Sequence, residues 1–420
     1  MENRKLRLVL VEPNGSGGLI HYTYQLCTAL ADEGVDVTLI TGKEYELAHL
    51  PHNFHVNTML DLWSLFDPQA VQQDHRNSWQ RRWHKLRWTA RRGQRAVRLL
   101  SAWVGLTRYL TELQPDIVQF SKISFPFEAI FLAQMRRRGL LLTQICHEFE
   151  QRENQRGLLS SLSVRAYANI YKNFSAIFFH ANENCEKFLS LYPFVDSKRT
   201  HIIPHGNSGW LLKYFPQDRD WSALRQRYGL KPGQPVIVFF GLLAPSKGIQ
   251  DLLDAFALVR KSSNAKLLIA GYPTKYFDME ELKQKIVDLE LTDHVVLDTR
   301  YIPLDDVGGL MGLATVAVYP YRSSTQSGAL QVAYTFGRPV VATAVGGLPE
   351  AVEHGRSGFL VPTNSPLELA ESILKLVTNH ELAKVMGEYS RHLSETRFSW
   401  KTVAQKIVKV YEGLLKKNSV

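Results

Sequence analysis

Residues 317–362 read AVYPYRSSTQSGALQVAYTFGRPVVATAVGGLPEAVEHGRSGFLVP, and they carry the strongest structural pattern in the chain. Short apolar segments at 315–319, 339–343 and 358–362 alternate with two segments of helical composition. This alternation predicts strands and helices in turn, the pattern of a parallel βα sheet. The chain is therefore expected to be an α/β protein.

Two glycine-containing turns in this stretch predict a ligand site. A helix is expected to begin near Gln326–Ser327, and its first amides have no carbonyl partner within the helix. Gly328 lacks a side chain, so an anion can approach those amides closely. The turn at 344–347 repeats the arrangement one strand later with Gly346 and Gly347. One such pair alone is explained by a tight turn, but two neighbouring pairs at one sheet edge favour a diphosphate held between them.

Three motifs in this region carry a family resemblance: FGRPVVAT at 336–343, GGLPE at 346–350 and GRSGFLVP at 355–362. The run resembles the family-4 glycosyltransferases, and the resemblance extends over nearly the whole chain. It implies the GT-B fold, in which two Rossmann-like domains face each other across a cleft. It also implies sugar transfer with retention of anomeric configuration and without a metal ion or other cofactor.

The chain departs from the family at three positions. The family has two glutamates eight residues apart, one for the donor sugar and one for the ribose, where this chain has Ser324 and Val332. The family's Gly-Arg-x-x-x-x-Lys-Gly loop is matched at Lys247, but Leu242 stands in place of the arginine. From its position after a strand, Arg322 is expected to replace that missing cation.

Composition sets the broad class. The chain has 420 residues, of which 45% are hydrophobic and 21% charged, enough for two α/β domains with their own cores. Its three scattered cysteines favour free thiols in a reducing compartment. The N-terminal apolar run is too short for a signal peptide, and no apolar span reaches membrane-crossing length. These features predict a cytoplasmic protein.

The pattern of strands predicts the domain organisation. An N-terminal acceptor domain is expected at 1–207, a donor domain at 208–399, and a final helix at 400–420 that packs back on the first domain. The expected strands outside the opening stretch lie at 5–11, 35–41, 116–121, 140–146, 176–180, 200–204, 236–241, 266–271 and 294–298.

The resemblance assigns roles to individual residues. His147, at the end of a strand, is expected beside the donor sugar, and Lys247 is expected to neutralise the diphosphate; both are the predicted catalytic residues. A structural role for either is the alternative. The predicted donor-binding residues are Gly17, Gly18, Gly241, Tyr301, Ile302, Arg322, Gln326, Ser327, Gly328 and Ala329. Further possible cleft residues are His205, Asn207, Gly346 and Gly347, although turn chemistry alone also explains them.

No metal site is expected. The triplet Asp218-Arg219-Asp220 falls in the interdomain linker before a predicted helix, where capping explains it better than metal binding.

An insertion at 70–112 carries nearly the whole excess charge. The net charge of the chain is +10, and residues 76–98 hold nine Arg/Lys and no acid. Apolar residues recur at helical spacing, continued by Val97, Leu100 and Val104, on one helix or on two broken near Gly93. A basic helix with tryptophans is typical of an interfacial membrane segment. The residues expected to meet an anionic membrane are Trp79, Arg81, Arg82, Trp83, Arg91 and Arg92. The alternatives are a stripe packed on the domain and, less favoured, nucleic acid, for which no motif is present.

These features predict a nucleotide-sugar-dependent, hexosyltransferase-type retaining glycosyltransferase. Its donor is a nucleotide-diphosphate sugar, and its acceptor is membrane-associated, either lipid-linked or a polysaccharide, as in exopolysaccharide biosynthesis. It is expected at the inner face of the membrane as a peripheral protein, with no nucleic acid partner. The competing hypothesis is a GT-B protein that lost catalysis with its polar residues and serves as a binding or partner subunit.

Overall fold

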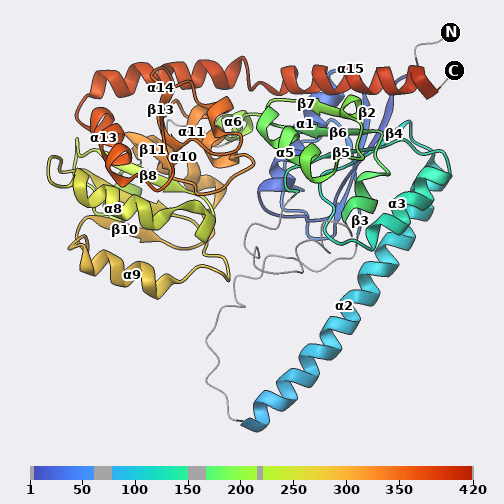
Figure 1. Ribbon diagram of the computed structural model, residues 1–420, viewed down its shortest axis with the longest axis horizontal. Helices are drawn as coiled ribbons and strands as arrows, with labels where there is room; N and C mark the ends of the chain where they lie inside the picture. Colours follow the sequence, from blue (N-terminus) through green and yellow to red (C-terminus); the bar gives the residue numbers. More distant parts are fainter. Residues whose placement is uncertain (1–3, 61–77, 150–166, 215–220, 419–420) are drawn as a thin grey trace.

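The computed structural model describes residues 4–60, 78–149, 167–214 and 221–418, and for 78–93 it describes the helix but not the side chains. The described chain forms two α/β domains side by side, joined at the top by long helices (Figure 1). The expected α/β class is confirmed. The predictions for Asp218, Asp220 and the side chains of Trp79, Arg81, Arg82, Trp83, Arg91 and Arg92 lie outside the described residues.

The N-terminal domain is built on a seven-stranded parallel sheet in the order β3-β2-β1-β4-β5-β6-β7. Its strands are β1 (Arg7–Glu12), β2 (Asp36–Gly42), β3 (His55–Leu60), β4 (Ile117–Phe120), β5 (Leu142–Ile145), β6 (Ala176–Phe179) and β7 (Thr200–Ile202). The first strand is central, and the strand order reverses direction between β1 and β4. Such a switch point leaves a crevice at the carboxyl ends of the strands, where ligands bind in open α/β sheets.

The C-terminal domain repeats this plan with a six-stranded sheet in the order β10-β9-β8-β11-β12-β13. Its strands are β8 (Val236–Phe240), β9 (Lys266–Ala270), β10 (Val295–Asp298), β11 (Val316–Tyr319), β12 (Val340–Thr343) and β13 (Gly358–Val361). All three strands expected in the opening stretch are present. The switch point of this sheet lies between β8 and β11.

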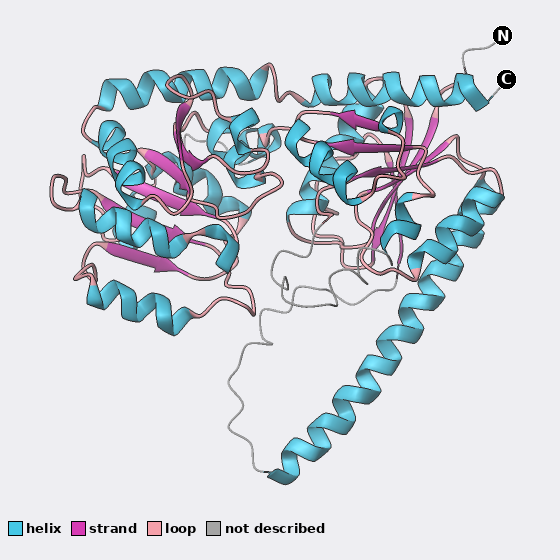
Figure 2. Ribbon diagram, viewed as in Figure 1, coloured by secondary structure: helices cyan, strands magenta, loops and turns pink. Residues whose placement is uncertain are grey.

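Helices cover both faces of each sheet (Figure 2). They are α1 (Gly18–Asp32), α2 (Ser78–Leu113), α3 (Glu128–Arg137), α5 (Asn182–Leu191), α6 (Gly209–Tyr214), α7 (Ser222–Arg227), α8 (Ile249–Val259), α9 (Met279–Asp288), α10 (Leu304–Leu313), α11 (Gly328–Thr335), α12 (Leu348–Ala351), α13 (Pro366–Val377), α14 (His380–Glu395) and α15 (Trp400–Asn418), with short 3-10 turns η1 (Ser197–Arg199) and η2 (Pro245–Lys247).

Strand β1 shows why its residues form a central strand. Leu8 and Leu10 point into one core of the N-terminal domain, whereas Val9 and Val11 point into the other. All four are at most 2% exposed. A strand covered on both faces must be apolar at every position, which is the continuous apolar run seen in the sequence.

Strand β3 was not predicted from the sequence. It reads HVNTML, pairs with β2 at the edge of the sheet, and only its last residue is buried. An edge strand with mixed polarity has neither a continuous apolar run nor clean alternation, so the pattern gave no signal.

Helix α2 is one continuous helix of 36 residues, with no break at Gly93, and it projects away from the N-terminal domain (Figure 1). Near its C-terminal end, Leu99, Trp103, Leu106 and Leu110 pack into the domain core. The expected stripe is on another face: Val97, Leu100 and Val104 are 66%, 46% and 58% exposed. In its described part, therefore, the stripe does not pack on the domain.

The chain crosses between the domains twice, near residue 207 and again between α14 and α15. Hydrogen bonds tie the two crossings together. The indole nitrogen of Trp400 donates to the carbonyl of Asn207 at 2.8 Å, and the amide of Asn207 donates to the carbonyl of Phe398 at 2.9 Å. A Cβ on Gly206 would lie 2.3 Å from the Trp400 ring, so only glycine fits there. After the second crossing α15 lies along α1.

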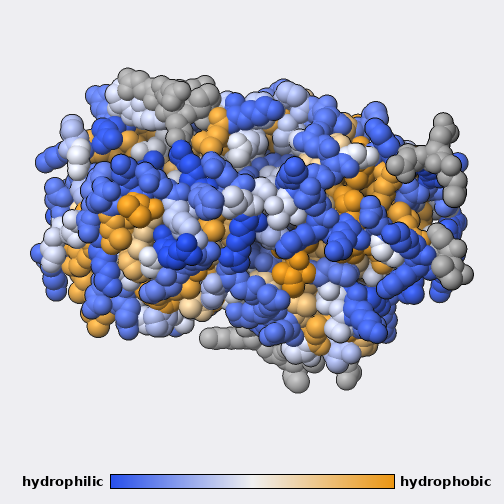
Figure 3. Space-filling view, turned by 90° about the horizontal axis from the view of Figure 1, so that it is seen from above, coloured by the Kyte–Doolittle hydropathy of each residue, from blue (hydrophilic) through white to orange (hydrophobic). Residues whose placement is uncertain are grey.

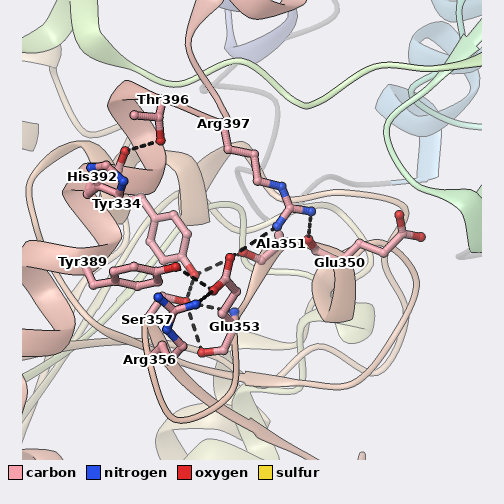
Figure 4. Close-up of polar contacts among 10 residues, drawn as sticks. All are labelled: Tyr334, Glu350, Ala351, Glu353, Arg356, Ser357, Tyr389, His392, Thr396 and Arg397. Atoms are coloured by element: carbon pink, nitrogen blue, oxygen red, sulfur yellow. Dashed lines mark hydrogen bonds and ion pairs between the residues drawn. The ribbon is translucent and has the colours of Figure 1, made fainter.

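A polar cluster anchors the chain just before the second crossing (Figure 4). Arg397 donates to the carbonyl of Glu350 at 2.7 Å and lies 3.7 Å from the carboxylate of Glu353. Tyr389 and Arg356 donate to the same carboxylate at 2.7 and 2.9 Å. The cluster fixes α14 and the crossing to the turn after α12.

Seen from above, the surface is largely hydrophilic, with apolar patches on both domains (Figure 3).

Candidate functional site

A cavity of about 680 Å³ lies between the two domains, at the carboxyl ends of both sheets. Its walls come from the loops after β1 and β2, the turns after β8, β9, β10 and β11, and the two crossings. Twelve residues expected at the site line it: Gly17, Gly18, His205, Asn207, Gly241, Lys247, Tyr301, Ile302, Gln326, Ser327, Gly328 and Ala329. Four others, His147, Arg322, Gly346 and Gly347, are not among the lining residues.

The start of α11 forms one wall. Ser327 caps the helix, because its Oγ accepts a hydrogen bond from the amide of Leu330 at 3.1 Å. Within the described part of the chain, the amides of Gly328 and Ala329 make no hydrogen bond. A Cβ on Gly328 would find its nearest neighbour, the His205 ring, at 3.8 Å. This helix start therefore presents open amides and the positive end of its dipole to the cavity.

Lys247 stands in the same part of the cavity. Its Nζ lies 3.8 Å from the ring centroid of Tyr321, a cation–π contact that orients the side chain. The turn that carries it depends on Gly248, which has a φ of 65° and whose added Cβ would lie 1.8 Å from the Pro320 carbonyl. Lys247 is the only Lys or Arg among the lining residues that are described. Leu242, in place of the family arginine, also lines the cavity.

Arg322 does not fill that place. Its guanidinium makes a bidentate ion pair with the carboxylate of Asp251, at 2.9 and 2.7 Å. Asp251 is in the first turn of α8, so the pair joins two elements of the C-terminal domain. The two bonds pair one edge of the guanidinium with the carboxylate, which balances its charge. The expectation that Arg322 replaces the missing cation is therefore corrected by this geometry.

Gly346 and Gly347 pack against the loop that leads into α11. A Cβ on Gly346 would lie 1.7 Å from the Ser324 carbonyl, and one on Gly347 would lie 2.6 Å from the Thr325 carbonyl. The amide of Gly347 donates to the Thr325 carbonyl at 3.1 Å. The glycine pair thus lets the turn pack against 324–326 and positions the loop that leads into α11. The two glycines, which were expected as possible cleft residues, are not among the lining residues of the cavity.

His147 lies beneath the cavity rather than in its lining. Its ring meets Tyr22 edge-on at a centroid distance of 4.7 Å and lies 5.1 Å from the ring of His180. Burial, reinforced by the nearby His205, lowers the pKa of His147 to about 3. Its Nε2 is buried without a hydrogen-bond partner among the described residues. The imidazole is therefore neutral, and its expected place beside the donor sugar is not reached in this arrangement.

The opposite wall is the glycine loop after β1. Gly17 has a φ of 89°, and neither Gly17 nor Gly18 would bring an added Cβ within 4 Å of another atom, so this loop is open to the cavity. The amide of Gly17 donates to Oε2 of Glu46 at 2.9 Å, and Nε2 of His21 lies 3.2 Å from the same oxygen. The hydroxyl of Tyr301, from the other domain, donates to Oε1 at 2.8 Å. One carboxylate thus joins the loop to the C-terminal domain.

Electrostatics keep Glu46 ionised. Burial by itself raises the pKa of this carboxyl, but the three donors around it outweigh burial and lower the pKa to about 2. At neutral pH the cavity therefore contains a fixed negative charge on the N-terminal side and the cation of Lys247 on the C-terminal side.

A seam of hydrogen bonds closes the cleft on one side of the cavity. Glu350 accepts from the amide of Asn182 at 2.6 Å and from its side chain at 2.8 Å, and so it caps α5 of the other domain. The remaining bonds are Asn184 Nδ2 to the Thr325 carbonyl at 2.6 Å, Thr325 Oγ1 to the His147 carbonyl at 2.6 Å, and Gln326 Nε2 to the His180 carbonyl at 3.1 Å. The structure thus represents a closed arrangement of the two domains.

Several lining residues were missed from the sequence. The most informative are His21, Glu46, Tyr272, Tyr321 and Trp400. Trp400 begins a helix and Glu46 follows a strand in a loop of ordinary composition, so neither had a local signal. Tyr321 lies two residues after the end of β11, and this position near a strand end was the signal that the sequence offered.

Two family models match the chain, one in each domain. The model for "Glycosyl transferase 4-like domain" matches residues 17–206, and the model for "Glycosyl transferases group 1" matches residues 234–379. The chain belongs to the GT-B glycosyltransferases. The family expected from the motifs is confirmed at this level, and so is the GT-B fold.

A solved structure confirms the GT-B fold over nearly the whole chain. Anabaena HepE, solved in complex with UDP and glucose, has a TM-score of 0.72 and 19% identity, with 97% of this chain and 100% of that chain covered. At this identity the similarity shows the fold alone.

Curated relatives match the glycosyltransferase over shorter stretches. The D-inositol 3-phosphate glycosyltransferase of Jonesia denitrificans is 29% identical over 248 residues, 57% of each chain. The GDP-mannose-dependent alpha-(1-6)-phosphatidylinositol monomannoside mannosyltransferase of Mycolicibacterium smegmatis is 30% identical over 211 residues, 47% of this chain and 53% of the relative. The matches span about half the length of the curated relatives.

Proposed function

We propose that the protein transfers a sugar from a nucleoside-diphosphate donor to an acceptor, with retention of anomeric configuration. The observation that carries the proposal is the interdomain cavity in which Lys247 and the open start of α11 lie together. This pairing of a cation with free amides suits a diphosphate. The UDP and glucose bound to HepE, and the GDP-mannose in one relative's name, support a nucleotide-sugar donor.

The chemistry follows from the leaving group. Cleavage of the anomeric C–O bond places negative charge on the diphosphate, so groups that stabilise that charge in the transition state accelerate the reaction. Lys247 and the amides of Gly328 and Ala329 supply this stabilisation without movement of charge in the protein. The proposal needs neither a metal ion nor a nucleophilic carboxylate, and activity is expected to persist in EDTA.

The experiment is a screen of UDP-, GDP- and ADP-sugars by thermal shift, followed by assay of nucleoside diphosphate release. A ligand at 100 times its Kd stabilises a protein by roughly 2.7 kcal/mol, which such a screen detects. One nucleotide sugar is expected to stabilise the protein and to be turned over. If none binds or reacts, the catalytically degenerate alternative, favoured by Ser324, Val332 and Leu242, takes the place of this proposal.

We also propose that the acceptor is membrane-associated and that α2 meets an anionic leaflet at the inner face of the membrane. The nine Arg/Lys and no acid at 76–98 support this, as do the exposed apolar side chains of Val97, Leu100 and Val104 on the projecting helix. Each basic residue near an anionic surface contributes about 1 kcal/mol. A phosphatidylinositol mannoside acceptor in one relative's name is consistent with this class of acceptor. None of the described helices is long and apolar enough to cross a membrane.

Liposome sedimentation tests the membrane proposal. Replacement of Arg81, Arg82, Arg91 and Arg92 by serine should release the protein from phosphatidylglycerol vesicles, and salt should weaken binding of the wild type. The matched control replaces Arg136, Arg137, Arg138 and Arg225, basic residues outside α2. Equal sedimentation of the α2 variant and the wild type would contradict the proposal.

A further inference from the structure

Glu46 is the only acid among the described residues that line the cavity, and it comes from the N-terminal domain. Two donors of its own domain and the Tyr301 hydroxyl of the other domain hold its carboxylate in place. The side chain is 23% exposed, so part of the carboxylate faces the cavity. A fixed, ionised carboxylate in a substrate cavity is an acceptor for substrate hydroxyls.

The carboxylate has capacity for a ligand. Two carboxylate oxygens offer about four acceptor sites, and the hydrogen bonds from the Gly17 amide and the Tyr301 hydroxyl use two of them. The Tyr301 hydroxyl reaches the carboxylate from the other domain, so the site that it occupies lies at the boundary between the domains. A ligand hydroxyl can therefore be added, or can take over from the tyrosine, without loss of the bonds to the glycine loop.

The donor domain offers little to a ribose. Four of its lining residues, Ile302, Leu304, Val307 and Val332, are apolar, and it contributes no carboxylate to the described lining. A nucleoside diphosphate with its phosphates at α11 must place its ribose diol elsewhere in the same cavity, which Glu46 and these apolar residues line. Buried hydroxyls without partners cost free energy, so that diol needs an acceptor.

We propose that Glu46 receives the ribose hydroxyls of the donor nucleotide, reaching across the cleft from the acceptor domain. Pairing of a carboxylate with a ribose diol is the chemistry that dinucleotide-binding folds use for the same group. The inference rests on the proposed function, because it requires a nucleoside diphosphate in the cavity. Nucleotide recognition is then divided between the domains, since the phosphates bind to one and the ribose to the other.

Calorimetry with matched nucleotides tests the inference. UDP, GDP and ADP identify the nucleotide that binds tightest, and that nucleotide is then compared with its 2′,3′-dideoxy analogue. Loss of hydrogen bonds to a charged acceptor should make the analogue bind about tenfold to one hundredfold more weakly to the wild type. In Glu46→Ala this preference should fall to within about twofold, and binding of inorganic pyrophosphate should stay unchanged.

Two controls separate recognition from a structural role. Tyr301→Phe removes the interdomain hydroxyl but leaves the carboxylate, so it should keep the preference for the ribose form. Glu46→Gln keeps the shape and the bond from Gly17, and its preference should fall as in the alanine variant. A wild type with no preference, or an unchanged preference in both Glu46 variants, would overturn the inference alone. Failure of the wild type to bind any nucleotide or pyrophosphate would overturn the proposed function as well.

Discussion

The helix starts of α1 and α11 face the same cavity, and each helix begins at a glycine, Gly18 in α1 and Gly328 in α11. They differ in charge. At α1 the amide of Gly17 already donates to the carboxylate of Glu46, whereas at α11 the amides of Gly328 and Ala329 donate to no acceptor in the described chain. The cation Lys247 lies in the turn after β8, next to β11 in the same sheet as α11.

This difference in charge separates two helix starts that both carry a glycine as the first helical residue. A helix start that already has an anion repels a second one, whereas an open helix start beside a lysine attracts it. The donor diphosphate is thus expected at α11. The α1 loop, with its own negative charge, suits a neutral, hydroxyl-rich partner.

The largest effect is expected from Lys247→Ala. Loss of a cation at the leaving group should reduce kcat by about 10²–10³ and leave the thermal midpoint unchanged, because the side chain lies at the cavity surface. Lys275→Ala, in a loop outside the cavity lining, is the matched control for steady-state kinetics. Near-wild-type turnover in Lys247→Ala would mean that another group neutralises the diphosphate. The proposed difference in charge between the α1 and α11 helix starts would then not determine where the diphosphate binds.

The next effect concerns pH. Burial lowers the pKa of His205, opposite the α11 start, to about 4 from its usual 6.5. Between these values the unfolded chain takes up a proton and the folded chain does not, so stability is lost as the pH falls. Urea denaturation at pH 7 and pH 5 should show a loss of stability in the wild type. His205→Asn should reduce that loss by an amount on the order of 2 kcal/mol.

Glu46→Gln is the control for that measurement. The pKa of Glu46 is lowered to about 2 from 4.5, so its contribution to stability is complete above pH 4.5 and is lost only below it. This variant should therefore show the same loss as the wild type between pH 7 and pH 5. An identical profile for His205→Asn and the wild type would contradict the neutral imidazole opposite α11.

A pair of glycine substitutions, one at each helix start, tests directly whether α1 and α11 differ in anion binding. Gly328→Ala has room for its methyl group, so it should fold normally but weaken pyrophosphate binding about tenfold by covering the open amides. Gly17→Ala forces a side chain into a left-handed conformation, with a φ of 89°, and should cost about 1 kcal/mol of stability with little effect on pyrophosphate. Calorimetry and thermal melts check both. Equal losses of pyrophosphate affinity would show that the two helix starts are equivalent.

The smallest effect is expected from Arg322→Ala. Its ion pair with Asp251 is partly exposed, since the Arg322 side chain is 44% exposed, and such pairs contribute less than about 1 kcal/mol. Nucleotide affinity should change less than about threefold, and Asp251→Asn should behave alike. A loss above tenfold in Arg322→Ala alone would mean that the guanidinium leaves Asp251 and joins the phosphate site.

The sequence predicted those elements and site residues that a local pattern of residues determines. Buried strands of continuous apolar residues, such as β8 and β11, were found because burial on both faces leaves no alternative composition. Lys247 and the α11 start were found because a motif places both at the ends of neighbouring strands. Strand β3 was missed because an edge strand is half exposed and has no such constraint.

Long-range contacts explain the remaining differences. The Arg322 side chain meets Asp251, 71 residues earlier, and no local pattern encodes that pairing. Glu46 becomes part of the cavity only when Tyr301, 255 residues later, donates to it. Gly346 and Gly347 were correctly expected at a turn, but the carbonyls of the loop against which they pack were not visible in the sequence.

The return of α15 to the first domain has a consequence for the order of synthesis. This helix lies along α1 and buries Val403, Ile407 and Tyr411, yet it is about two hundred residues downstream of the first crossing. At translation rates of about 5–20 residues per second, the ribosome needs roughly 10–40 s to make that interval. The domain that emerges first is therefore completed last, and until then the face of α1 that α15 will cover is available to chaperones.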